Sequence, residues 1–298
     1  MKGIVLAGGS GSRLHPMTLA VSKQLLPIGD KPMVYYPLSV LLHANIRDIL
    51  IITTPEDQPN FRRLLGDGSW LGINITYAEQ AAPNGLAEAF IIGADHVGDD
   101  TAALVLGDNI FHGPGFAEVL EKYADDVKGC VLFGYPVRDP ERYGVGETDG
   151  TGRLISIEEK PKHPRSHMAI TGLYFYDNDV IDIAKSIKPS ARGELEITEV
   201  NRVYLSRGMA HLVELGRGFA WLDTGTPESL LEAGHYVQTL EHRQGIRLSC
   251  LEEIAVRKGY IDIDAFRALG ATMPKAGYGR YILEVADELV ASGAVPVK

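Results

Sequence analysis

The sequence predicts an α/β fold in which a mostly parallel, mixed sheet is flanked by helices. Two observations predict it: short strands rich in valine and isoleucine recur along the chain, and segments with apolar residues at helical spacing lie between them. Strands covered on both faces become apolar along their whole length, so this alternation is typical of a doubly wound sheet. With 298 residues, the chain is long enough to bury such a core without disulfides or a structural metal.

The alternation is clearest in the first half of the chain. Apolar runs there predict strands, and helical spacing of apolar residues between the runs predicts helices. The expected strands cover residues 3–7, 48–54, 74–79, 102–107 and 130–137, and the expected helices cover residues 33–44, 86–97 and 116–124.

After about residue 140 the pattern changes. A turn at residues 149–152 (Asp-Gly-Thr-Gly) predicts a β-hairpin over 144–159, and Thr226-Pro227-Glu228 is a helix-start signal. We therefore expect two parts, a core over residues 1–240 and a helical region over 241–298 packed on it. The further elements expected are a strand at 168–176, helices at 179–187 and 196–206, a strand pair within 209–222, a long helix over 227–244, and mostly helical structure over 245–298.

The composition limits the kinds of partner. Hydrophobic residues make up 45% of the chain and charged residues 23%, the balance of a globular protein. The formal net charge is −10 and no basic run occurs, which argues against DNA or RNA as a partner. Any bound anion must therefore meet a local cluster of cations. The chain leads directly into its first strand, without a signal segment or a long apolar span, so we expect a cytoplasmic location.

A glycine-rich loop from Gly8 to Leu14 follows the first strand. Glycines let the backbone turn sharply and present N–H groups to an anion. The loop lacks the Gly-Lys-Ser/Thr end of a Walker A motif. Leu14 stands where a dinucleotide fingerprint has its third glycine, which disfavours an NAD-linked oxidoreductase. On its own, the loop leaves phosphate binding and a simple turn equally open.

Two cations near the loop favour phosphate. Arg13 lies within the loop, and Lys23 lies in the segment 22–27. Together they can neutralise a triphosphate and stabilise the charge that develops as pyrophosphate leaves. The alternative is a pair of solvated surface cations. Lys23 stands between Val21 and Leu25, and these apolar surroundings favour a buried, ligand-binding position.

Two aspartates are each expected at the end of a strand. Asp108 follows an apolar run that ends at Gly107, and Asp223 follows the run 219–222. Ligands of open α/β sheets bind beyond the carboxyl ends of strands. A pair of carboxylates there suits Mg²⁺, which accepts one or two of them together with phosphate oxygens and water. Each aspartate alone can equally cap a turn, so the metal site requires that the two side chains meet.

Read together, these residues resemble the signature of bacterial sugar-phosphate nucleotidyltransferases. The signature is carried by residues 8–16 (Gly-Gly-Ser-Gly-Ser-Arg-Leu-His-Pro) and 22–27 (Ser-Lys-Gln-Leu-Leu-Pro). Longer stretches are similar to the glucose-1-phosphate thymidylyltransferases of that family, namely residues 30–39, 64–69, 106–111, 139–145, 192–198 and 221–226. The resemblance spans nearly the whole chain up to about residue 260.

The resemblance implies a Rossmann-like nucleotidyltransferase core that includes a sugar-phosphate-binding part over about residues 140–225. It implies Mg²⁺-assisted transfer of the thymidylyl group of dTTP to α-D-glucose 1-phosphate, which gives dTDP-glucose and pyrophosphate as the first step of dTDP-L-rhamnose synthesis. It also implies a homotetramer that is inhibited by dTDP-L-rhamnose at a second site between subunits, with Arg217, Gly218 and Glu253.

The resemblance further implies which residues form the active site. The catalytic residues would be Arg13, Lys23, Asp108 and Asp223, and the two aspartates would bind the metal. The nucleotide would contact Leu6, Gly8, Gly9, Ser10, Gly11, Ser12, Arg13, Lys23, Gln24, Gln80, Gly85 and Asp108, and the sugar phosphate would contact Asn109, Tyr143, Gly144, Glu159, Lys160, Ile170 and Arg192.

The implied reaction needs no enzyme nucleophile or general base, because a sugar phosphate is already anionic. Gln80 carries an amide donor and an acceptor, which match N3–H and O4 of thymine and of uracil equally well. Without the resemblance, Glu159 would be assigned as a solvated hairpin carboxylate, and the sequence alone leaves a surface position open for Gln80. The alternatives that stay open are a uridylyltransferase, a transferase for another sugar 1-phosphate, and a sugar-nucleotide sensor without turnover.

Overall fold

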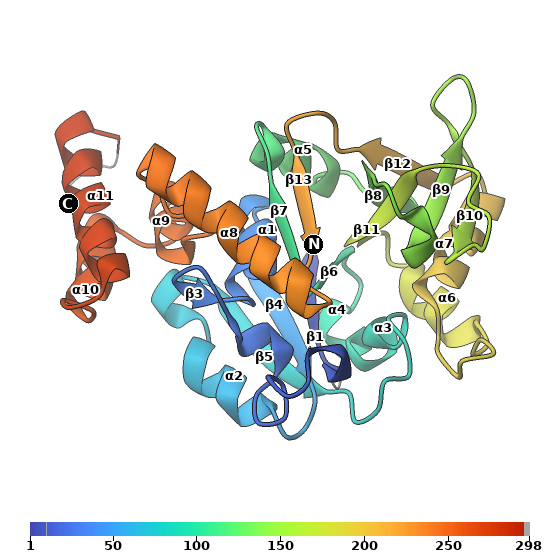
Figure 1. The fold of residues 1–298 in the computed structure, drawn as a ribbon, viewed down its shortest axis with the longest axis horizontal. Helices are drawn as coiled ribbons and strands as arrows, with labels where there is room; N and C mark the ends of the chain where they lie inside the picture. The colour runs from blue at the N-terminus through green and yellow to red at the C-terminus, as the bar shows by residue number, and fades with distance from the viewer. Residues whose placement is uncertain (10, 295–298) are drawn as a thin grey trace.

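The computed structural model describes residues 1–9 and 11–294 (Figure 1). Its largest sheet has nine strands, ordered β10-β9-β11-β6-β1-β4-β5, with β8 paired to β11 and β12 paired to β8. The strands are β1 (Lys2–Ala7), β4 (Asp48–Thr53), β5 (Asn74–Glu79), β6 (Ala102–Leu106), β8 (Cys130–Pro136), β9 (Gly144–Thr148), β10 (Leu154–Glu159), β11 (Met168–Tyr176) and β12 (Ala210–Glu214). The predicted mixed, mostly parallel sheet is confirmed.

Helices cover both faces of the sheet. They are α1 (Tyr35–His43), α2 (Gln58–Leu65), α3 (Glu88–Ile92), α4 (Ala94–Val97), α5 (Phe116–Ala124), α6 (Val180–Ser186), α7 (Ile197–Ser206), α8 (Pro227–Gln244), α9 (Leu251–Arg257), α10 (Ile263–Ala271) and α11 (Gly277–Ser292). None of the helices described is both long enough and apolar enough to cross a membrane.

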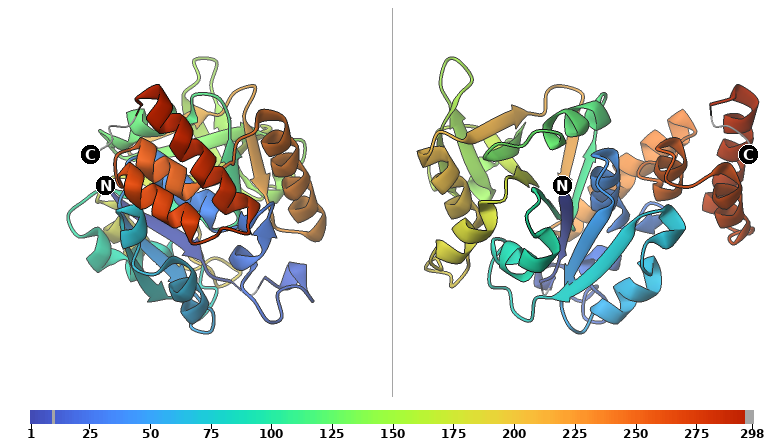
Figure 2. Two further views of the ribbon diagram at one scale, coloured as in Figure 1. Left: turned by 90° about the vertical axis from the view of Figure 1, so that its left-hand side faces the viewer. Right: turned by 180° about the vertical axis from the view of Figure 1, so that it is seen from behind.

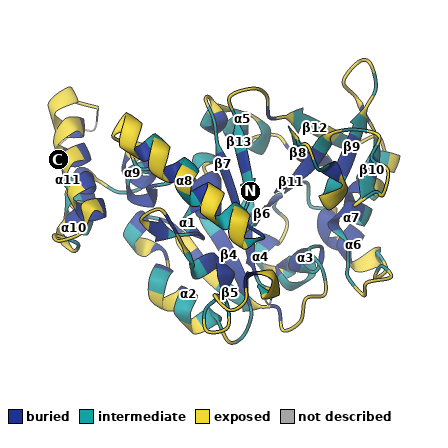
Figure 3. Ribbon diagram, in the orientation of Figure 1, coloured by how far each residue is buried: buried dark blue, intermediate teal, exposed yellow. Residues whose placement is uncertain are grey.

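Alternate residues of each central strand enter two separate cores, as expected for a sheet that is buried on both faces. Val5 of β1 belongs to a core with α1, α2 and α5, whereas Ile4 belongs to a core with α3, α6 and α7. Figure 3 shows these strands buried, while the outer sides of α8, α10 and α11 are exposed. The two cores hold the edges of the strands in fixed positions.

The order of the parallel strands places the ligand-binding edge. β1 pairs in parallel with β4 on one side and with β6 on the other. At such a change of direction in the strand order, the loops after the carboxyl ends diverge and leave a crevice. The glycine loop follows β1, Gln80 follows β5, and Asp108 follows β6, so all three meet at this edge.

The helix predicted over 86–97 is wrong as a single element, because it divides into α3 and α4 at Gly93. The backbone leaves the helical conformation there, with φ −85° and ψ 6°. A Cβ atom at this position would lie only 3.0 Å from the Ile4 side chain of β1. The glycine therefore allows the chain to bend while it packs closely on the sheet.

The strand pair predicted within 209–222 is also wrong as a pair. β12 joins the main sheet beside β8, in parallel. The second strand, β13 (Ala220–Asp223), pairs instead with β7 (Asn109–His112) in an antiparallel ribbon. β7 is not among the strands expected from the sequence. This ribbon joins two segments that lie far apart in the sequence.

The predicted helix over 227–244 is confirmed as α8. Its start is capped by Thr226, whose Oγ1 accepts from the Ser229 N–H at 3.2 Å, with Pro227 in the first helical position. α8 packs over the small ribbon of β2 (Pro27–Ile28) and β3 (Lys31–Pro32). The other predicted elements are confirmed with small shifts at their ends.

The predicted helical end of the chain is confirmed as α9, α10 and α11, which lie at one end of the molecule, beyond α8 (Figure 2). These helices share a core around Phe266, Tyr281 and Ile282. Leu251 and Ile254 of α9 belong instead to the core under α1. The helical end is therefore anchored to the sheet-containing body by α9.

Candidate active site

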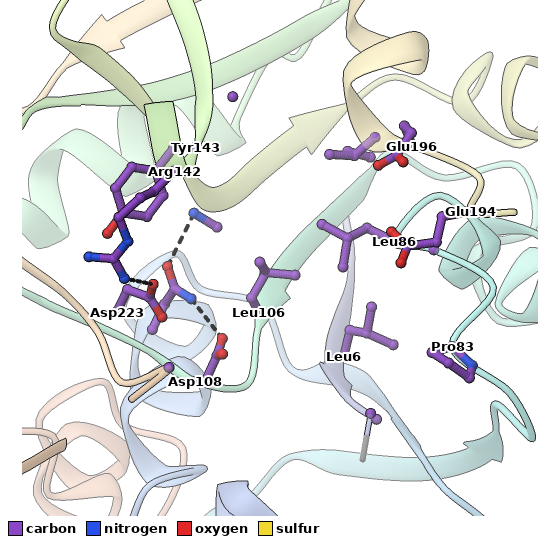
Figure 4. Close-up of a pocket in the computed structure, with 18 of the residues that line it drawn as sticks. Leu6, Pro83, Leu86, Leu106, Asp108, Arg142, Tyr143, Glu194, Glu196 and Asp223 are labelled. Atoms are coloured by element: carbon purple, nitrogen blue, oxygen red, sulfur yellow. Dashed lines mark hydrogen bonds and ion pairs between the residues drawn. The ribbon is translucent and has the colours of Figure 1, made fainter. Parts of the chain in front are cut away.

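A cleft of about 590 Å³ opens at the carboxyl edge of the sheet. Figure 4 shows Asp108 and Asp223 on one side of it and Glu194 and Glu196 on the other. The sequence-predicted residues that line the cleft are Leu6, Gly8, Gly9, Gly11, Ser12, Arg13, Lys23, Gln24, Gln80, Gly85, Asp108, Asn109, Tyr143, Gly144, Glu159, Lys160, Ile170, Arg192 and Asp223. Segments from both halves of the chain thus share one cavity.

Four predicted residues are not placed in this cleft. Ser10 lies outside the residues that the structure describes. Arg217 and Gly218 are exposed in the loop before β13, and Gly218 lies against Pro114. Glu253 lies in α9, where it pairs with Arg257 at 2.8 Å. These three residues form no part of the lining of the cleft.

The glycine loop presents its backbone to the cleft. Gly9 and Gly11 have φ of 98° and 58°, a left-handed conformation that side chains disfavour. Arg13 follows in a short 3₁₀ turn and is exposed, while the neighbouring Leu14 is fully buried and anchors the turn. The loop is therefore fixed at its far end and open toward solvent at Arg13.

Lys23 is not a solvated surface cation. Only 8% of the residue is exposed, and its Nζ forms an ion pair with Asp108 Oδ2. Burial opposes ionisation of Asp108, but the Lys23 ammonium and hydrogen bonds from Lys23 and Asn109 outweigh it, so the pKa of Asp108 is lowered. Asp108 is thus held as a carboxylate beside a buried cation.

The β7–β13 ribbon brings Asp223 to Asp108. Asp223 pairs in register with Asn109, the residue after Asp108. Thr224 fixes the same junction, because its Oγ1 donates to the Asp108 carbonyl at 2.8 Å. Burial and the negative charge of Asp108 raise the pKa of Asp223, against the opposing charges of Lys23, Arg142 and Arg13. The two carboxylates are therefore close enough to repel one another.

This donor set fits a hard divalent cation. Two carboxylates that repel one another are relieved by a bound cation, and oxygen ligands suit Mg²⁺ better than thiolates or imidazoles do. Over residues 1–9 and 11–294, no group of three or more His, Cys, Asp or Glu side chains has an arrangement for holding a metal ion. An ion held by Asp108 and Asp223 would take its remaining ligands from phosphate oxygens and water.

Asn109 supports the Asp108 carboxylate. It is 3% exposed, and its Nδ2 donates to Asp108 Oδ1 at 2.8 Å. Its own Oδ1 accepts from Trp221 Nε1 at 2.6 Å and from the Gly172 N–H at 3.2 Å. The contacts with Trp221 and Gly172 cross to β13 and β11. Asn109 is therefore tied to two strands that also line the cleft.

Gln80 is buried at the end of β5, with 6% of the residue exposed. Its Nε2 donates to the Gly85 carbonyl at 3.2 Å and to Glu88 Oε2 at 2.7 Å. Both amide hydrogens are thus used within the protein. The expectation that Gln80 offers both a donor and an acceptor to a base is therefore wrong for this structure, in which the amide oxygen alone remains.

The opposite wall of the cleft combines cations with carboxylates. Glu159 is half-buried and accepts from Thr198 Oγ1 at 2.6 Å. Arg192 Nη2 lies 2.8 Å from Glu196, 3.5 Å from Glu159 and 3.6 Å from Glu194. Its charge is therefore shared among three carboxylates.

Sequence reasoning missed several lining residues. Arg142 Nη2 lies 3.7 Å from Asp223 Oδ2, which adds a third cation near the two aspartates. Trp221 donates a hydrogen bond to Asn109, and Thr198 donates one to Glu159. Arg142 lies within a stretch that carried the resemblance, but no local pattern marked it as a neighbour of Asp223. Only the folded structure shows the contact between the 3₁₀ turn that ends at Arg142 and the end of β13.

Replacement of Gly85 by alanine is expected to lower the free energy of unfolding by about 2–4 kcal/mol. Gly85 has φ 107°, and a Cβ atom there would collide with the backbone of Leu195. The collision would separate segments joined by two backbone hydrogen bonds, Leu195 N–H to Asn84 O at 2.6 Å and Ala87 N–H to Leu195 O at 3.1 Å. Urea unfolding measures the change.

Gly98→Ala is the matched control. Gly98 also has a left-handed φ, 57°, but a Cβ atom there meets nothing within 4 Å. The control should lose only about 1 kcal/mol, from backbone strain. An equal loss in both variants would contradict the close approach at Gly85.

Comparisons with known proteins agree with this geometry. Residues 2–239 match the family model described as nucleotidyl transferase. A glucose-1-phosphate thymidylyltransferase of Mycolicibacterium smegmatis is 59% identical over 96% of this chain and 99% of its own length. One from Neisseria meningitidis is 57% identical, again over 96% of this chain and 99% of its own length.

Solved structures share the fold. A Bacillus anthracis protein assigned as a glucose-1-phosphate thymidylyltransferase, in complex with sucrose, has a TM-score of 0.73 and 43% identity, covering 79% of this chain and 94% of its own. A UDP-glucose pyrophosphorylase with UDP-glucose has a TM-score of 0.68, covers 80% of this chain and 98% of its own, and at 24% identity shows the fold alone. The chain therefore belongs to the nucleotidyl transferase family and, within it, to the glucose-1-phosphate thymidylyltransferases.

Proposed function

We propose that this enzyme transfers the thymidylyl group of dTTP to α-D-glucose 1-phosphate, giving dTDP-glucose and pyrophosphate. The observation that carries the proposal is the single cleft in which Arg13, Lys23, Asp108 and Asp223 face a wall with Lys160 and Arg192. The relatives named glucose-1-phosphate thymidylyltransferase support the same substrates. The reaction would supply the first step of dTDP-L-rhamnose synthesis.

The chemistry follows from bringing two polyanions together. An oxygen of the sugar phosphate attacks the α-phosphorus of dTTP, and the bond from that phosphorus to the bridging oxygen breaks as pyrophosphate leaves. The attacking oxygen is already ionised, so the protein positions it in line and neutralises charge. We assign the glycine loop, Arg13 and Lys23 to the triphosphate, and Lys160 and Arg192 to the sugar phosphate.

Members of the nucleotidyl transferase family generally need a divalent metal ion. We propose Mg²⁺, held by Asp108 and Asp223. When bound, the ion would neutralise charge on the phosphates and polarise the P–O bonds. Lys23, already paired with Asp108, would stay next to the phosphates as a second positive charge.

We assign the opposite wall of the cleft to the sugar, because its side chains can form hydrogen bonds with sugar hydroxyls and with the phosphate. Glu159 and Glu196 are acceptors for sugar hydroxyls, since a carboxylate accepts from hydroxyl groups through charge-assisted bonds. Arg192 already lies between them. A bound phosphate would compete with these carboxylates for the guanidinium. We assign Asn109, Tyr143, Gly144 and Ile170 to the same wall.

Pyrophosphate release from dTTP or UTP, measured against a panel of hexose 1-phosphates with and without Mg²⁺, tests the proposal. We expect turnover with dTTP and glucose 1-phosphate, and its loss when the metal is chelated. A preference for UTP would identify a uridylyltransferase. Binding without any pyrophosphate release would identify a sensor.

Lys160→Ala is expected to raise the KM for glucose 1-phosphate about tenfold, while the KM for dTTP stays within about twofold. The Lys160 side chain extends from the end of the hairpin, 3.7 Å from Glu159, on the sugar wall. Steady-state kinetics with each substrate varied in turn measures both constants. Lys162→Ala, an exposed lysine two positions along, is the matched control and should change neither. A larger rise for dTTP would contradict the division of roles.

We also propose a homotetramer with a second site for dTDP-L-rhamnose that includes Arg217, Gly218 and Glu253. The support is the resemblance of these stretches to the family, and the position of all three outside the cleft. Titration of activity with dTDP-L-rhamnose should give inhibition that Arg217→Ala weakens. Saturating dTDP-L-rhamnose without inhibition would end this proposal. A cytoplasmic location stays a prediction from the sequence.

A further inference from the structure

The Gln80 side chain ends in a carboxamide whose orientation is fixed by the protein. Its nitrogen donates to two acceptors, the Gly85 carbonyl and the Glu88 carboxylate. Neither acceptor carries a hydrogen, since a carboxylate and a carbonyl oxygen only accept. A flipped amide would place its oxygen against both of them. The nitrogen is therefore confined to this side.

Glu88 is itself held in place. It is half-buried at the first position of α3, and its Oε1 accepts from Asn84 Nδ2 at 2.8 Å while its Oε2 accepts from Gln80. An acidic residue in the first turn of a helix is also favoured by the helix dipole. Both carboxylate oxygens are thus engaged, and the carboxylate does not rotate freely.

The Gln80 oxygen points the other way, toward the glycine loop. A Cβ atom built on Gly8 would lie 3.1 Å from Gln80 Oε1. Gly8 and Gln80 both line the cleft, so a ligand that approaches the loop meets an acceptor and no donor from this amide.

We infer that Glu88 is a positioning residue that fixes Gln80 as an acceptor and thereby selects a pyrimidine whose N3 carries a hydrogen. This inference rests on the proposed function, in which Gln80 contacts the base. Thymine and uracil donate from N3–H. Cytosine has a lone pair at N3, which would face the Gln80 oxygen, and an unpaired buried polar group is costly. Glu88 therefore acts on the choice of base and not on the chemical step.

The test measures kcat/KM for dTTP and for dCTP, with glucose 1-phosphate as the second substrate, in wild type and variants. Glu88→Ala frees the amide, and we expect the dTTP:dCTP ratio to fall about tenfold. The KM for dTTP should rise while kcat stays within about twofold. Glu88→Gln retains an acceptor oxygen and should keep the ratio within about threefold of wild type. Asn84→Ala removes one hydrogen bond to Glu88 and should lower the dTTP:dCTP ratio by less than Glu88→Ala does.

Glu79→Ala is the matched control, because Glu79 is the exposed neighbour of Gln80 and has the same charge as Glu88. The dTTP:dCTP ratio of Glu79→Ala should equal that of wild type. An unchanged ratio in folded Glu88→Ala and Asn84→Ala would overturn the inference.

Calorimetric binding of dTTP and dCTP to the same proteins separates this outcome from a failure of the proposed function. If the wild-type enzyme shows no turnover, that result refutes the proposed activity and leaves the inference about Glu88 to the binding data. A lower ratio of dTTP affinity to dCTP affinity in Glu88→Ala than in wild type supports the inference. An unchanged ratio of these affinities overturns it.

Discussion

Asp108→Asn is expected to lower kcat by about 10³-fold, because a metal contact in the transition state contributes several kcal/mol. Asparagine preserves the size of the side chain and the oxygen that accepts from Asn109. It removes the negative charge that pairs with Lys23 and that would bind the ion with Asp223. Single-turnover measurement of pyrophosphate release isolates the chemical step.

The fold should survive this change. Removal of the Lys23 counter-ion is expected to cost about 1–3 kcal/mol of unfolding free energy, since the cleft admits water to the ammonium. Asp48→Asn is the matched control: Asp48 pairs with Lys2 at 2.8 Å at the opposite edge of the same sheet. The control should retain its rate. A rate for Asp108→Asn within about tenfold of wild type would remove the metal assignment.

Lys23→Met is expected to lower kcat/KM by about 10²- to 10³-fold, the cost of removing a charged donor from a transition state. Methionine fills a similar volume in this buried position without the charge. Lys2→Met removes the lysine of the corresponding pair at the other edge of the sheet and should leave kcat/KM unchanged. Lys23→Arg should also be impaired, because a planar guanidinium does not fit the site of a compact ammonium.

The same variant should change the pH dependence. Burial raises the pKa of Asp108, and Lys23 is the main group that lowers it. Without Lys23 the pKa of Asp108 rises, and the carboxylate needed for activity is lost at a higher pH than in wild type. The acid limb of the pH–rate profile should therefore move upward. An unchanged acid limb would contradict the ion pair as the cause of the low pKa.

Features that depend on local sequence were predicted well. The strands, the glycine loop and the start of α8 are marked by residues that lie close together, since periodicity and capping act over a few positions. The split at Gly93 was missed because the glycine is needed for contact with Ile4, a residue of another element. The amphipathic spacing of apolar residues continues through Gly93, so the spacing alone predicts one uninterrupted helix.

The site depended more on distant contacts. Lys23, Asp108 and Asp223 were selected individually, but the β7–β13 ribbon that brings the aspartates together has no local signal. The expectation that Gln80 offers a donor as well as an acceptor was wrong for a similar reason. Both hydrogens of its amide are engaged by Gly85 and Glu88, and the types of side chain alone do not show which neighbours they reach.

The β7–β13 ribbon also determines when the proposed metal site is complete during synthesis of the chain. A nascent chain can form the loop after β1 and the end of β6 early, but the strand that carries Asp223 emerges from the ribosome only near the end of the catalytic body. Until it docks, Asp108 has Lys23 beside it but no second carboxylate. Chains that end before β13 would therefore lack the proposed metal site, and turnover would begin only after Asp223 has docked.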